Sequence, residues 1–213
     1  MKYCFSFTAG SSIASQIFAG FLFLTVSVAN VGAATEISAS EVVRNTTEQV
    51  LGALRKEGNE IEGNSERLYK LVDELILPHF DFIKMSRWVL GRHWRKATPT
   101  QQTAFTEQFQ GLLVRTYAQA LIDFRDQEVE ILPMEAKSGE TVVVRSQISQ
   151  EGGATTPITY KMHMKDKVWK VYDVSIDGVS LVINYRASFN QEIKRNGIDE
   201  LIKRLAAHNS KNT

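Results

Sequence analysis

The segment from Trp169 to Phe189 constrains the fold more than any other, because a strand in it passes almost directly into a helix. Trp169 to Ile176 indicates a strand, Asp177-Gly178 a tight turn, and the mostly apolar residues that follow the start of a helix. A strand that leads straight into an apolar helix forms one wall of a hydrophobic interior. We therefore expect a sheet and helices that face each other across such an interior.

The first half of the chain indicates helices. Ser38-Ala39-Ser40-Glu41 matches a capping box and predicts a helix to about Lys56, and a second helix is predicted over 65–76. Thr98-Pro99-Thr100-Gln101 combines a capping box with proline at the first helical position, which predicts a helix to about Arg125. The apolar stripe of this last helix is broad enough to contact two different surfaces.

The second half indicates four strands, at 128–134, 141–149, about 158–165 and from Val168 onward. In the third, apolar residues at 158, 160, 162 and 164 alternate with polar ones, which predicts one buried and one solvated face. A final helical region breaks near Asn196-Gly197. Helices followed by a four-stranded antiparallel meander predict the α+β class.

Residues 1–34 have the pattern of a signal peptide. Lys2 is their one charged residue, an apolar run covers 17–31, and Gly32-Ala33-Ala34 forms a small-residue exit, so we expect cleavage after Ala34. The alternative is an anchor that is retained in the membrane. Cys4 is the one cysteine of the chain, so residues 35–213 contain no disulfide, catalytic thiol or zinc–thiolate site. We expect 35–213 to form a single domain.

Charge argues against a nucleic-acid partner, because the 25 basic and 24 acidic residues nearly balance. One segment, 87–96, does combine basic and aromatic side chains. It suggests a surface that docks a partner or contacts lipid phosphate. The alternative is that its tryptophans are buried in the hydrophobic core. The residues assigned to this surface are Arg87, Trp88, Arg92, Trp94 and Arg95.

Catalytic signals are weak. The four histidines show no metal-ligand spacing, so we expect no metal and no cofactor, and the alternation predicts a solvated His163. Asp173 and Asp177 lie near one strand end, and either could act as a base if it lined a cavity. Asp177 precedes Gly178, which is more typical of a turn.

Two stretches, WKVYDVSIDGVSLVINYRASF at 169–189 and LGRHWRKATPTQQTAFTEQFQGLLVRTYAQAL at 90–121, resemble the MlaC family, also called the toluene-tolerance or ABC-transporter auxiliary family. The resemblance covers nearly the whole chain after the leader. It implies a periplasmic phospholipid carrier that shuttles lipid between the outer and inner membranes and so maintains outer-membrane lipid asymmetry. It further implies no reaction and no cofactor, and two partners: an inner-membrane ABC transporter with a lipid-binding ring, and an outer-membrane lipoprotein–porin complex.

The resemblance also implies a curved, NTF2-like sheet that encloses a lipid cavity together with the helices. The apolar stripes alone do not distinguish such a cavity from a filled core. A phospholipid would need a slot at or beyond about 1,000 Å³, the upper end of ordinary pockets. The residues expected to bind lipid are Leu113, Tyr117, Leu121, Val143, Met162, Met164, Val174, Ile176, Val179, Val182 and Phe189. Two other functions remain open: a small NTF2-like enzyme that uses Asp173 or Asp177 as its base, and an adaptor of membrane complexes that binds no lipid.

Overall fold

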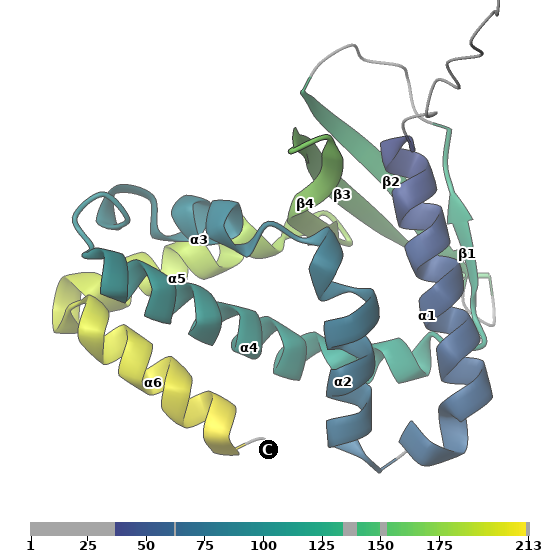
Figure 1. Cartoon of the computed structure of the whole chain (residues 1–213), viewed down its shortest axis with the longest axis horizontal. Coiled ribbons are helices and arrows are strands. Elements are labelled where there is room, and N and C mark those ends of the chain that lie inside the picture. The colour runs from purple at the N-terminus through teal and green to yellow at the C-terminus, as the bar shows by residue number, and fades with distance from the viewer. Residues whose placement is uncertain (1–36, 62, 134–139, 150–152, 212–213) are drawn as a thin grey trace, which may run out of the picture. The chain divides into compact units, whose positions relative to one another are not determined.

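Four helices precede a sheet and two helices follow it, as the α+β prediction requires (Figure 1). A computed structural model describes residues 37–61, 63–133, 140–149 and 153–211, so the expected leader at 1–34 lies outside the described residues. The long helices are α1 (Ala39–Ile61), α2 (Ser65–Leu75), α3 (Phe82–Leu90), α4 (Pro99–Asp123), α5 (Leu181–Asn196) and α6 (Ile198–Lys211). Short 3₁₀ turns, η1 (Leu77–His79) and η2 (Gly91–His93), flank α3.

Both predicted capping boxes are present. The Glu41 N–H donates to Ser38 Oγ at 3.2 Å and the Ser38 N–H donates to Glu41 Oε2 at 2.8 Å. At α4, the Gln101 N–H donates to Thr98 Oγ1 at 3.2 Å and the Thr98 N–H to Gln101 Oε1 at 3.0 Å. Each pair satisfies two amide donors that a helix N-terminus leaves without partners. Helix α1 continues past the predicted end to Ile61, whose buried side chain packs with α2.

The sheet is an antiparallel meander in the order β1-β2-β3-β4-β5. Its strands are β1 (Glu128–Ile131), β2 (Thr141–Ser149), β3 (Thr155–Lys165), β4 (Val168–Ile176) and β5 (Val179–Ser180). The expected count of four strands omitted β5. Asp177 and Gly178 both have positive φ, 50° and 78°, and form a two-residue hairpin that pairs β5 with β4 before the helix begins. Ser180 then caps α5, since its Oγ accepts the Ile183 N–H at 3.1 Å.

Strand β4 carries one extra residue. Lys161 pairs with Asp173, but the next residue of β3, Met162, pairs with Val171, which leaves Tyr172 as a bulge. The bulge changes which side chains share a face. Val171 and Val174 both belong to the interior, whereas the Tyr172 ring contacts Trp88 and His163 on the side of α3, with centroids 5.8 and 5.7 Å away.

The helices enclose two different apolar regions. We call the first the solid core: it is formed by α3, the first half of α4, α5 and α6, and is centred on Phe105, Phe109 and Phe189. The second lies between α1, α2, the second half of α4 and the inner face of the sheet (Figure 1). Helix α4 contributes to both, so its broad stripe does contact two surfaces.

Candidate functional site

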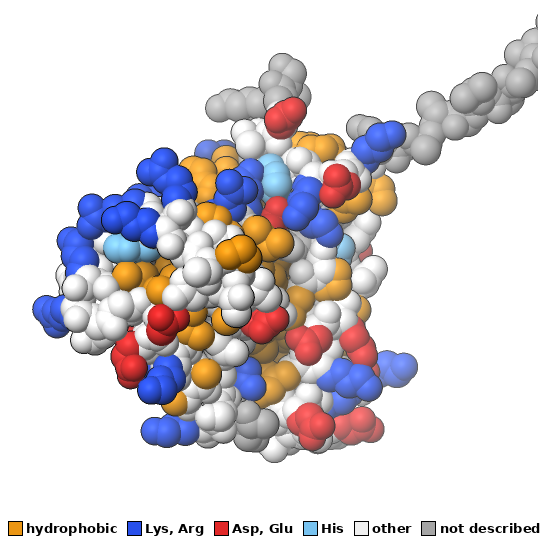
Figure 2. Space-filling model, turned by 60° about the vertical axis from the view of Figure 1, so that its left-hand side comes forward, with side chains coloured by type: hydrophobic (Ala, Val, Ile, Leu, Met, Phe, Trp, Pro, Cys, Tyr) orange, Lys and Arg blue, Asp and Glu red, His pale blue; other side chains and the backbone are white. Residues whose placement is uncertain are grey.

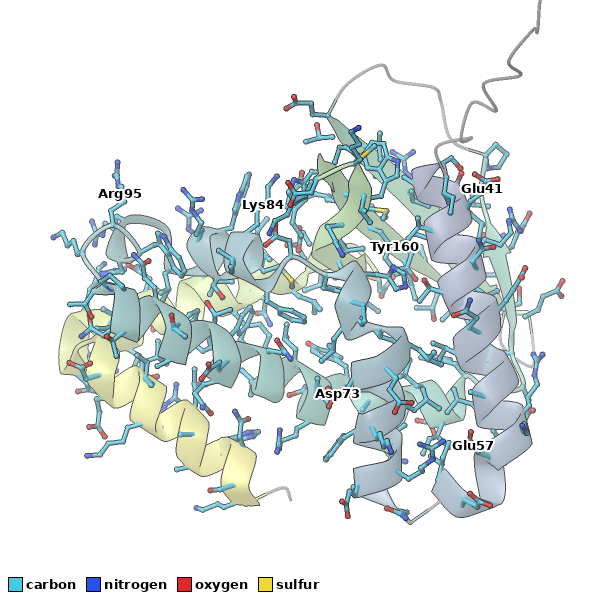
Figure 3. All side chains as sticks on the ribbon, viewed as in Figure 1. Glu41, Glu57, Asp73, Lys84, Arg95 and Tyr160 are labelled. Carbon is cyan, nitrogen blue, oxygen red and sulfur yellow. The ribbon has the colours of Figure 1, made fainter. Side chains whose placement is uncertain are left out.

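The second region contains an apolar cavity of about 290 Å³. One side of α1 covers it, the C-terminal half of α4 and the α2–η1 segment form its sides, and β2, β3 and β4 form its floor. Figure 3 shows Tyr160 of β3 in the space between the sheet and the helices. The lining is mainly valine, leucine and isoleucine, with Phe80, Phe82 and Phe124 at the ends of elements.

The lining has no formal charge at neutral pH. Among the described residues, none that lines the cavity is Lys, Arg, Asp or Glu. Burial, with a smaller effect of the neighbouring Tyr185, raises the pKa of Tyr117 to about 12, and burial also raises the pKa of Tyr160, so both phenols stay protonated. Burial and then the nearby Lys170 lower the pKa of His79, which keeps that imidazole neutral. A space with such walls favours hydrocarbon over water.

Six of the residues expected to bind lipid line this cavity. They come from the second half of α4 and from the inner faces of β3 and β4, and are Leu113, Tyr117, Leu121, Met162, Val174 and Ile176. The clean alternation of β3 indicated Met162, and the apolar stripe of α4 indicated Leu113, Tyr117 and Leu121.

The structure places the other five outside the lining. Val143 is 38% exposed on the outer face of β2, opposite Lys161, because three consecutive valines gave no alternation from which to choose a face. Val179 is 56% exposed in β5, the strand that was not expected. Val182 and Phe189 are buried in the solid core, and Met164 lies at the far end of β3 opposite Trp169.

Helix α1 was missing from the expected site, although it contributes Val43, Thr47, Val50, Leu51 and Leu54 to the lining. The helical spacing of its apolar residues is visible in the sequence. Nothing in that spacing indicates which element α1 covers, because an amphipathic stripe is the same over a filled and a hollow interior.

A second depression, about 680 Å³ in volume, lies on the other side of α3 and includes Arg87 and Trp88 from the expected partner surface. Arg92 and Arg95 are exposed but lie outside it, and Trp94 packs against the solid core. The prediction of a solvated His163 is wrong. Its side chain is only 13% exposed, and its Nε2–H donates to the Asp81 carboxylate at 3.1 Å.

Neither candidate base lines the cavity. Asp173 is 3% exposed, and its carboxylate accepts the Ser180 hydroxyl at 2.8 Å and the Val182 N–H at 3.3 Å, beside Lys161 Nζ at 2.9 Å. It therefore joins β4 to the start of α5. Asp177 is exposed in the hairpin turn.

Within the described ranges, no helix combines the length and the apolarity needed to cross a bilayer.

The family described as MlaC protein matches residues 44–207. Two relatives are similar in sequence. The toluene tolerance protein ttg2D of Pseudomonas putida is 28% identical over 160 residues (75% of this chain and 74% of the relative). The intermembrane phospholipid transport system binding protein MlaC of Haemophilus influenzae is 24% identical over 178 residues (81% and 83%).

A solved structure agrees with these matches. The phospholipid-binding protein of Ralstonia solanacearum, determined in complex with a phospholipid, superposes with a TM-score of 0.76 at 33% identity. The match covers 82% of this chain and 98% of the other. The match over 44–207, two curated relatives and a shared fold together identify this chain as a member of the MlaC family.

Proposed function

We propose that this protein binds a phospholipid by its acyl chains in the cavity and carries it through water between two membranes. The observation that carries the proposal is the uncharged apolar lining described above. The relatives named for phospholipid binding and transport support it.

The size of the hydrophobic effect explains why such a carrier needs an apolar cavity. Each methylene removed from water contributes about 0.8 kcal/mol, so roughly 30 methylenes of two acyl chains correspond to on the order of 20 kcal/mol. A carrier must offset most of this amount while the lipid is away from a membrane. The polar head group remains in water and requires little from the protein.

The cavity volume adds a condition to the proposal. At about 290 Å³, it lies at the small end of ligand pockets, which run from about 300 to 1,000 Å³, and well below the slot expected from the sequence. A two-chain lipid therefore requires α1 and the sheet to separate as it enters. Their contact depends on side chains such as Val43 and Val144, which can part without breaking any strand pairing.

The place and direction of transport belong to the same proposal. We propose that the chain acts in the periplasm after loss of its leader. It receives and delivers lipid at two partners, an outer-membrane lipoprotein–porin complex and an inner-membrane ABC transporter with a lipid-binding ring. In this way it maintains the lipid asymmetry of the outer membrane. The ATP of the transporter supplies the energy, and this chain performs no reaction.

The experiment is mass spectrometry of an organic extract of the purified protein, with a variant that fills the cavity. Val182 is unsuitable because it lies in the solid core. Thr47 lines the cavity from α1, whereas its neighbour Glu48 is exposed. We expect diacyl lipid in the wild type, several-fold less in Thr47→Trp, and an unchanged amount in the control Glu48→Trp.

Two results would count against the proposal. No lipid in the wild-type extract, even after incubation with vesicles, would favour the adaptor. Equal lipid in both folded tryptophan variants would show that the lipid binds elsewhere.

A further inference from the structure

The depression on the outer side of α3 is separate from the lipid cavity. Phe82 and Met85 of α3 line the cavity, whereas Lys84, Arg87 and Trp88 of the same helix line the depression. Lys165 of β3 and Arg186 of α5 also line it, together with Asp81, Ile83, Gly91 and His163. We call these nine residues the outer groove. Because α3 stands between the two spaces, the outer groove does not form part of the cargo site.

Positive charge dominates the outer groove. Among the described residues that line it, Asp81 is the one acidic residue, and its carboxylate is already paired: Lys165 Nζ lies 3.1 Å from it, and the Lys84 N–H donates to it at 2.9 Å. Within the described part of the chain, Arg87 and Arg186 form no ion pair, so two guanidinium groups remain available. In Figure 2 several Lys and Arg side chains lie close together at the upper left of the view, and Figure 3 shows Lys84 and Arg95 away from Glu57 and Asp73.

The geometry of the groove favours an oxyanion. A guanidinium group presents its N–H donors as a planar fork that matches two oxygens of a phosphate group. Arg186 lies against Gly91, where a Cβ atom would be 3.2 Å from Nη2, so the absence of a side chain at position 91 leaves room for this arginine. Lys84 Nζ lies 4.4 Å from the centre of the Tyr172 ring.

Large apolar side chains are exposed beside these cations. Ile83 is 53% exposed, Trp88 51%, and Ile183, one turn before Arg186 on α5, 64%. Tryptophan and isoleucine next to basic residues are typical of segments that lie at a membrane–water interface, where the rings and aliphatic groups enter the head-group region.

We propose that the outer groove is a membrane-contact surface that binds the phosphate groups of anionic lipids in a bilayer, with Trp88, Ile83 and Ile183 entering the interface. Charge complementarity points to an anionic occupant. An acidic protein segment would also need a shape that matches three projecting apolar side chains, whereas a bilayer accepts them without one. The contact would hold the carrier at a membrane while its separate cavity exchanges lipid.

The test is flotation of the purified protein with vesicles. We expect binding to vesicles of phosphatidylglycerol and phosphatidylethanolamine, much weaker binding to phosphatidylcholine alone, and loss of binding as salt is raised. Trp88 emission should shift to shorter wavelength on binding, and Trp88→Phe should abolish that shift. The double variant Arg87→Glu/Arg186→Glu should bind at least about tenfold more weakly, a loss of roughly 1.4 kcal/mol.

The matched control is Arg44→Glu/Lys56→Glu, which reverses two exposed charges on α1. It should bind like the wild type. Lipid recovered from all these variants should be unchanged, which separates failure of this proposal from failure of the proposed cargo. Equal loss in both double variants, or equal binding to neutral vesicles, would refute it. Binding to a polyglutamate peptide but not to vesicles would assign the groove to an acidic protein. Binding of inorganic phosphate without binding to vesicles would assign it to a free phosphate.

Discussion

The solid core and the cavity region are built from different side chains, although α4 passes through both. In the solid core, Phe105, Phe109 and Phe189 stack or meet edge to face, with ring centroids 5.7 to 6.1 Å apart. Around the cavity the walls are mainly aliphatic, and α4 turns Val114, Ala118 and Leu121 toward it. Interlocking rings fill space from several directions, whereas opposed aliphatic walls can face each other across a gap.

This difference suggests a division of labour. A cavity lacks the dispersion contacts that a packed interior gains, so the walls alone are a weak source of stability. The solid core supplies the packing contacts that the cavity lacks. It also fixes one end of α4, while the other end borders the cavity. Substitutions in the two regions should therefore change stability and lipid binding unequally.

The largest effect is expected from Phe109→Ala. Truncation of a fully buried phenylalanine should lower the free energy of unfolding by about 3 to 5 kcal/mol. Leu121→Ala, on the same helix at the cavity wall, should cost much less, because its half-buried side chain already borders empty space. Urea denaturation of both variants measures the difference, and equal losses would remove the distinction between the two regions.

Asp173→Asn tests the joint between the regions, because Asp173 connects β4 of the cavity floor to α5 of the solid core. The amide keeps one acceptor oxygen but turns the other into an NH2 donor, so one of the bonds from Ser180 and Val182 is lost, at a cost of about 1 to 3 kcal/mol. Lys161 is 38% exposed, so solvent screening leaves its ion pair a small share. Asp177→Asn in the exposed turn is the control. Lipid recovery should be unchanged in both, and its loss without unfolding would revive a direct role of Asp173.

Thr98→Ala removes the cap of α4 at the end that lies in the solid core. We expect a loss of about 1 kcal/mol, with Thr103→Ala, exposed in the second turn of the same helix, as control. Thermal denaturation with and without bound lipid should show the same loss. A loss confined to the lipid-free protein would mean that this end of α4 also responds to the cargo.

The smallest effect is a pH dependence at the contact between α3 and the sheet. Burial and then Lys84 lower the pKa of His163, although Asp81 opposes this shift. The unfolded chain therefore binds a proton more readily, so the free energy of unfolding should fall as pH drops below about 6.5. His163→Gln should flatten part of that slope, and the exposed His208→Gln should not. An unchanged slope in His163→Gln would contradict the assignment.

The parts of the fold that were predictable are those encoded within a few neighbouring residues. The boxes at Ser38 and Thr98 marked helix starts because side chain and backbone satisfy each other locally. The side of α4 toward the cavity and the inner face of β3 followed from periodicity.

The remaining positions depended on contacts across the sheet or between helices. Val143 required the register against β3, and the bulge at Tyr172 exists only in the pairing of β4 with β3. Val182 and Phe189 lie on a helix that joins the solid core rather than the hollow, a choice that the packing of α5 against α3 and α6 makes. The resemblance correctly predicted the family but not this division of the interior.

The bulge at Tyr172 changes which positions of β4 face the interior. Upstream of it, odd-numbered positions such as Val171 point inward, and downstream even-numbered ones such as Val174 and Ile176 do. Deletion of Tyr172 would restore regular alternation, with Val171, Asp173 and Val174 on their present faces, and would remove the ring that contacts Trp88 and His163. The strand should therefore tolerate loss of this residue better than a one-residue change of length elsewhere in β4, which would exchange its inner and outer faces.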